Sequence, residues 1–146
     1  MNKDGYVMHY VCTHEEAWEL IQKQEQFWVS NCGCRENRGK CTQSRLDVCL
    51  MFTDQVAPTG SGMHPINFDD ARRILQEGRQ KMLVARPFRS EKDPSVVEGI
   101  CFCCDDCCAY FLDPTEICDE GDLIEVTDHD KCTLCGDCAP ICYFHA

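Results

Sequence analysis

Four cysteines near the C-terminal end of the sequence have a spacing that suits metal chemistry. They follow one another at intervals of three, three and four residues: Cys132, Cys135, Cys138 and Cys142. A tight loop with this spacing can direct three thiolates toward one point, and thiolates are the ligands that iron–sulfur clusters select. The spacing therefore predicts a cluster-binding loop.

A second triplet of cysteines repeats the three-residue interval further upstream. Cys101, Cys104 and Cys107 lie in a crowded run that also contains Cys103 and Cys108. The position that would match the fourth cysteine of the C-terminal motif is Phe111. The two triplets together predict two cluster sites, which are not simple copies of each other.

A third set of thiols lies in the first half of the chain. Its four members fall within eighteen residues: Cys32, Cys34, Cys41 and Cys49. Four thiolates can close on one tetrahedral zinc ion or on an iron–sulfur cluster, so we expect a shared metal site here. The alternative is a set of separate cysteines, and Cys49, inside an apolar run, is the most typical of ordinary packing.

Basic residues accompany this third set. Arg35, Arg38 and Lys40 lie between its cysteines, and positive charge stabilises nearby thiolates. The same residues would also be ordinary in a solvated loop. The sequence leaves both readings open.

The overall charge limits the partners to be expected. The formal net charge is −11 at pH 7, and thiolate-held clusters would make it more negative. Binding to nucleic acid requires a basic surface, so we expect no nucleic-acid partner. An acidic surface suits docking to a basic patch on a redox partner, although the acids can equally serve solubility alone.

The cysteine content indicates the compartment. The chain has 15 cysteines in 146 residues, and its first ten residues contain no apolar run typical of a signal peptide. No later stretch approaches the ~18 apolar residues of a membrane-spanning helix, so no membrane insertion is expected. We therefore expect a soluble, cytoplasmic protein with reduced, metal-binding thiols.

Local patterns predict the elements that must position these thiols. Thr13 and Glu16 form a capping box at the start of a predicted amphipathic helix over residues 13–28. Asn67 is expected to cap a second helix, which is followed by a strand over residues 82–86 that stops at Pro87. A short helix is expected to begin after Cys108.

The C-terminal part, over residues 122–146, resembles the cluster motif of bacterial-type ferredoxins. Gly136 and Pro140 stand at family positions, and residues 123–130 are similar to the strand that enters the motif. Tyr143 replaces the proline that usually follows the fourth cysteine. The resemblance implies an α+β fold with a ferredoxin-like domain at residues 99–146, against which a helical and mixed region at residues 1–98 packs.

The resemblance also implies a ligand scheme. In two-cluster ferredoxins the fourth cysteine of each motif binds the other cluster, so Cys142 would complete a [4Fe-4S] cluster held by Cys101, Cys104 and Cys107. The cluster on Cys132, Cys135 and Cys138 would then need another ligand. The nearest candidates for that ligand are Cys108 and Cys103, and Cys118 is the next. Two [4Fe-4S] clusters are expected, with a third cluster or zinc on the upstream thiols.

The function expected from these features is electron transfer, by a free carrier or by a subunit of an anaerobic redox complex. A flavoprotein or another iron–sulfur protein would be the partner. Fully ligated clusters leave no iron open to substrate, so an enzyme is less expected than a carrier. Two alternatives stay open, namely a redox or metal sensor that binds a partner through residues 67–86, and an enzyme with an incompletely ligated cluster.

Overall fold

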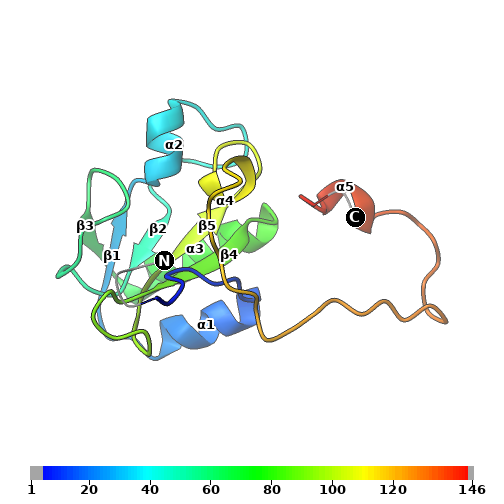
Figure 1. Ribbon diagram of the computed structural model, residues 1–146, viewed down its shortest axis with the longest axis horizontal. Helices are drawn as coiled ribbons and strands as arrows, with labels where there is room; N and C mark the ends of the chain where they lie inside the picture. Colours follow the sequence, from blue (N-terminus) through cyan, green and yellow to red (C-terminus); the bar gives the residue numbers. More distant parts are fainter. Residues whose placement is uncertain (1–4, 145–146) are drawn as a thin grey trace.

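A five-stranded antiparallel sheet forms the centre of the computed structural model, which describes residues 5–144 (Figure 1). The strands lie in the order β3-β1-β2-β5-β4. Their bounds are β1 Phe27–Ser30, β2 Cys49–Met51, β3 His64–Ile66, β4 Val84–Arg89 and β5 Val97–Cys103. The predicted combination of helix and strand is confirmed, while the ferredoxin-like domain stays a prediction.

The two longest helices pack against each other beside this sheet: α1 His14–Gln22 and α3 Phe68–Gln80. The predicted capping boxes are present at both, on Thr13 and Asn67. The first helix is shorter than predicted, because residues 23–26 are all polar and offer no apolar face to bury. Phe27 and Trp28 then begin β1, as their aromatic side chains favour strand.

Strand β4 continues through Pro87, so the predicted stop at this residue is wrong. Pro87 pairs with Ile100 of β5 and its carbonyl oxygen accepts a hydrogen bond from Tyr10 N. Proline is tolerated because β4 is the last strand of the sheet, where a missing N–H leaves no gap in an inner ladder.

Side chains alternate between the two faces of the sheet along β5, so the thiols of Cys101 and Cys103 lie on the same face. Phe102 of β5 packs toward α3, where a Cβ added to Gly78 would lie 2.7 Å from its ring. Its neighbours Cys101 and Cys103 therefore point to the opposite face. The expected boundary between residues 98 and 99 falls inside β5, which pairs with both β2 and β4.

One end of the sheet gathers the segments that contain most cysteines. The end of β1, the start of β2 and the end of β5 meet there, because these neighbouring strands are antiparallel. Two short helices cover this end: α2 Gly33–Arg38 and α4 Ala109–Leu112 (Figure 1). Helix α4 agrees with the short helix expected after Cys108.

The C-terminal part leaves the sheet as an extended arm and ends near it again with α5 Cys138–Ile141 (Figure 1). Residues 123–130 form no strand, and their apolar side chains Leu123, Ile124 and Val126 are exposed. Beyond the arm, Tyr143 packs against Phe111 with ring centroids 5.5 Å apart. Within residues 5–144, no helix has the length and apolar character needed to cross a membrane.

Candidate metal centre

Two groups of three thiols form where α2 meets the loop after β5. One group consists of Cys32, Cys34 and Cys108, and the other of Cys41, Cys104 and Cys107. Within each group all sulfur atoms lie within 4.8 Å of one another. Each group thus combines residues 32–41 with residues 104–108, and each can hold a metal ion.

The distances in the second group suit one ion. The Sγ atoms of Cys41 and Cys104 are 3.7 Å apart, those of Cys104 and Cys107 3.3 Å, and those of Cys107 and Cys41 3.5 Å. Four thiolates around one tetrahedral zinc ion, with bonds of about 2.3 Å, stand ~3.8 Å apart. In a four-iron cluster each thiolate binds a different iron, so the sulfur atoms stand further apart. The geometry therefore fits a single ion better than it fits a cluster.

Two glycines set the course of the backbone around α2. A Cβ added to Gly33, between Cys32 and Cys34, would lie 2.0 Å from the carbonyl oxygen of Thr59. Only glycine allows this close approach of the two backbones. Gly39 ends α2 in the left-handed conformation, with φ of 75°, so that the chain turns back toward Cys41.

Arg35 is fully buried next to the second group. Its Nε donates to Cys41 Sγ at 3.3 Å, and its Nη2 donates to the carbonyl oxygen of Phe102 at 2.9 Å and lies 3.6 Å from Cys104 Sγ. Burial alone would lower the pKa of Arg35, but the hydrogen bonds with Cys104 and Cys41 raise it above its ordinary value. The guanidinium therefore stays charged and is a counter-ion for thiolates.

The loop after Cys41 is bound to the loop that contains the other two ligands. Thr42 donates to Asp106 Oδ2 from its backbone N at 2.6 Å and from Oγ1 at 3.0 Å. A carboxylate that accepts two hydrogen bonds holds the two loops at a fixed separation. These bonds orient Cys41 toward Cys104 and Cys107.

Hydrogen bonds between the thiols connect the two groups. The bond with Cys108, together with those of Cys107 and Arg35, lowers the pKa of Cys104 to about 4 although burial opposes this. Bonds with Cys108 and then Cys34 lower the pKa of Cys32 in the same way. Each group thus contains one thiol that is readily ionised, which is the form that binds metal.

The remaining interior cysteines lie around these groups. Cys49 hydrogen-bonds with Cys101, which raises the pKa of Cys49 well above its usual range, and also with Cys32. Cys103 hydrogen-bonds with Cys108, and this bond is the first of several that raise the pKa of Cys108. The thiols therefore form a connected network at one end of the sheet.

The groups that form differ from the groups expected from spacing alone. Of the upstream set, Cys32 and Cys34 meet Cys108, Cys41 meets Cys104 and Cys107, and Cys49 lies beside Cys101. The triplet 101, 104 and 107 keeps only its last two members together. Cys132, Cys135 and Cys138 are exposed, and Cys142 is half-buried. Among residues 5–144 the C-terminal motif contributes to neither group.

A second buried arginine, Arg86, lies outside the cysteine-rich segments. Of the three residues between the upstream cysteines, Arg35 is buried while Arg38 and Lys40 are exposed. Arg86 of β4 is also buried; it pairs with Glu116, lies over the ring of Tyr110, and its Nε donates to Cys118 Sγ at 3.3 Å. Its position among the consecutive apolar residues Val84, Ala85, Pro87 and Phe88 is the only sequence signal for this burial.

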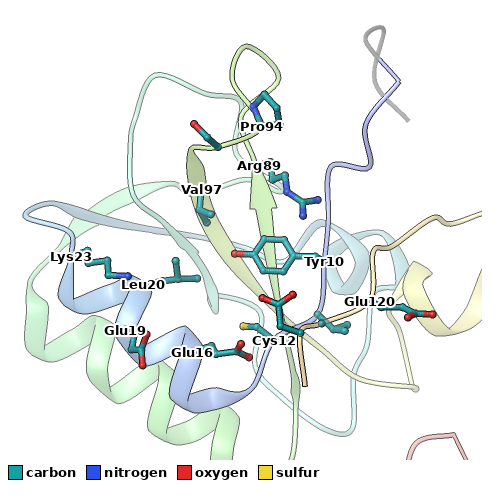
Figure 2. A pocket seen from close by; sticks show the side chains of 14 residues that line it. Tyr10, Cys12, Glu16, Glu19, Leu20, Lys23, Arg89, Pro94, Val97 and Glu120 are labelled. Atoms are coloured by element: carbon teal, nitrogen blue, oxygen red, sulfur yellow. The ribbon is translucent and has the colours of Figure 1, made fainter. Parts of the chain in front are cut away.

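A pocket of about 330 Å³ lies at a distance from the thiol groups, beside α1 (Figure 2). Figure 2 shows Cys12 and Glu16 side by side in it, and the guanidinium of Arg89 lies 4.6 Å from the ring of Tyr10. Burial first, and then the charge of Glu16, raise the pKa of Cys12 to about 12. This thiol stays protonated at neutral pH, so we assign it no metal.

The fold and the site define a small α+β protein with cysteine groups that can hold metal ions. No protein-family model matches the chain, and neither the curated proteins nor the solved structures provide a match. The chemistry of the site is therefore the basis for assigning a function.

Proposed function

We propose that this chain is an iron–sulfur electron-transfer protein, either a free carrier or the electron-carrying subunit of an anaerobic redox complex. The C-terminal cysteines hold a [4Fe-4S] cluster in this proposal, and the interior thiols hold a second iron centre. The ferredoxin resemblance supports the first part. The two interior thiol groups beside Arg35 support the second.

The observation that carries the proposal is the way in which these thiols are buried and balanced. Cys104 is completely buried and bonded to a buried guanidinium, while Cys34 and Cys41 are only half-buried. A centre built this way is protected from solvent on one side and close to the surface on the other. Such a position suits exchange of electrons with a docked partner, since reduction potential and access depend on burial around the sulfur atoms.

The proposed partner is a redox protein with a basic docking surface, such as a flavoprotein or another iron–sulfur protein. The net charge of −11 favours such docking over contact with an acidic partner. All fifteen cysteines are free thiols in the structure, which suits a reducing compartment such as the cytoplasm.

The test is anaerobic purification followed by counting of iron, acid-labile sulfide and zinc per chain. The proposal requires sulfide-containing iron and a reversible one-electron reduction. Full zinc occupancy without sulfide or reducible iron would reject it.

The sulfur separations are equally compatible with a second candidate, a zinc-containing sensor or interaction module. Distances of 3.3 to 3.7 Å suit one zinc ion as well as one iron ion. Such a protein would hold zinc in the interior groups and undergo no one-electron reduction. The same metal count separates the two candidates.

A further inference from the structure

A small pocket of about 210 Å³ lies beside the group formed by Cys41, Cys104 and Cys107. Arg35, Lys40, Cys41 and Ser44 are among the residues that line it. One water molecule occupies ~30 Å³ in the liquid, so the pocket has room for a small anion with some water. Cys41, which lines this pocket, is therefore also a candidate metal ligand.

Two buried polar atoms on the lining side chains lack hydrogen-bond partners among the described residues. These atoms are Arg35 Nη1 and Ser44 Oγ. A buried donor without a partner costs about 1 to 3 kcal/mol, and a charged donor costs more. An acceptor in the pocket within hydrogen-bond distance of these two atoms would satisfy both groups.

The charges around the pocket favour an anion as this acceptor. Arg35 and Lys40 bring positive charge to the lining. The one acid in the lining, Glu36, already accepts hydrogen bonds from Ser61 and then from Asn31, which lower the pKa of its carboxyl group. The pocket thus offers donors and positive charge without a free carboxylate.

We propose that this pocket binds a small inorganic anion as the fourth ligand of a metal ion held by Cys41, Cys104 and Cys107. Three thiolates leave one position of a tetrahedral ion open, as in metal sites that exchange ligands. Arg35 Nη1 and Ser44 Oγ would donate hydrogen bonds to this anion. The inference depends on metal binding at this group, which is part of the proposed function, but not on electron transfer.

The competing occupant of the fourth position is Cys142, the ligand implied by the ferredoxin resemblance. Its neighbour Tyr143 packs on Phe111, and the charge of Cys104 contributes to the raised pKa of Tyr143, after burial. The two alternatives make opposite predictions. If Cys142 is the ligand, the native protein is closed to anions and Cys142→Ser opens it.

The test uses the full chain loaded anaerobically with cobalt(II), whose visible bands respond to the coordination of a thiolate site. Sodium azide is the probe. We expect a saturable shift of the bands in the native chain and in Cys142→Ser. We expect Ser44→Ala to weaken azide binding about tenfold or more, because it removes a hydrogen bond to a charged ligand. Ser95→Ala, at an exposed hydroxyl away from the pocket, is the matched control and should bind azide as the native chain does.

The outcomes separate this inference from the metal centre. If Cys41→Ser binds as much cobalt as the native chain, the metal centre itself is rejected and the inference with it. If cobalt binds through Cys41 but azide leaves its bands unchanged, or binds Ser44→Ala equally well, the metal centre stands and the anion site is rejected. A response that appears only in Cys142→Ser assigns the fourth position to Cys142.

Discussion

Arg35 of α2 donates a hydrogen bond to the carbonyl oxygen of Phe102 in β5, 67 residues further along the chain, at 2.9 Å. This bond joins the helix that contributes Cys34 to the strand that leads into Cys104. The two segments that provide the thiols are therefore fixed to each other by a charged group as well as by any metal they share.

Replacing Arg35 with methionine should destabilise the protein by about 3 kcal/mol, because it leaves buried thiolates without their counter-charge. Chemical denaturation of the metal-loaded chain under anaerobic conditions measures this change. Arg38→Met, at an exposed position of the same helix, is the matched control and should change stability little. Equal stability of the two variants would show that Arg35 has no such role.

The thiol grouping predicts which double substitution is redundant. Cys41→Ser and Cys107→Ser should each remove the same metal ion, so the double variant should lose no more metal than either single variant. Cys41→Ser combined with Cys32→Ser should lose two ions, because these residues belong to different groups. Elemental analysis of the purified variants provides the count. Additive loss for the first pair would contradict the grouping.

Gly33→Ala should weaken both thiol groups together. The added methyl group would lie 2.0 Å from the carbonyl oxygen of Thr59 and would displace the start of α2, at a cost of about 1 to 3 kcal/mol. Competition with a chelator should show lower metal affinity at both groups. Arg38→Ala in the same helix provides the control. If Gly33→Ala binds metal with native affinity, the loop around Thr59 moves away without cost and the prediction is wrong.

Stability should fall in acid because of His9. Burial, followed by the charge of Arg86, lowers the pKa of His9 from 6.5 to about 4 in the folded protein. The folded state therefore binds fewer protons than the unfolded state, and stability that is present above pH 6.5 is lost as the pH falls toward 4. Between pH 7 and pH 5 this loss is about 2 kcal/mol.

The measurement compares the native chain with His9→Gln, which lacks this titration and should lose less stability over the same range. His64→Gln, at an exposed histidine, is the control and should follow the native chain. Any acid-driven loss of metal affects all three proteins alike and cancels in the comparison. Parallel curves for the native chain and His9→Gln would contradict the prediction.

Local chemistry explains which elements could be predicted from sequence. The capping boxes at Thr13 and Asn67 involve residues three apart, so they can be recognised in the sequence without knowledge of the fold. The proximity of Cys104 and Cys107 is local in the same sense. Residues 123–130 show the limit of this reasoning, because a strand forms only where a neighbouring strand supplies its hydrogen bonds.

The members of each thiol group could not be predicted from the spacing of the cysteines alone. Cys41 and Cys104 are 63 residues apart, and their contact depends on the register between β2 and β5. The buried position of Arg35 depends on the same register, since its partner is the carbonyl oxygen of Phe102. Spacing predicted that these segments bind metal, and the sheet determines which thiols share a site.

The interleaving of the two thiol groups has a consequence for biosynthesis. Neither residues 32–41 nor residues 104–108 contain a complete group, so a nascent chain has no finished interior site until residue 107 has left the ribosome and β5 has paired with β2. Metal capture at these positions would thus follow folding. A cell could then deliver the metal at a late step, when the site already has the shape that selects among ions.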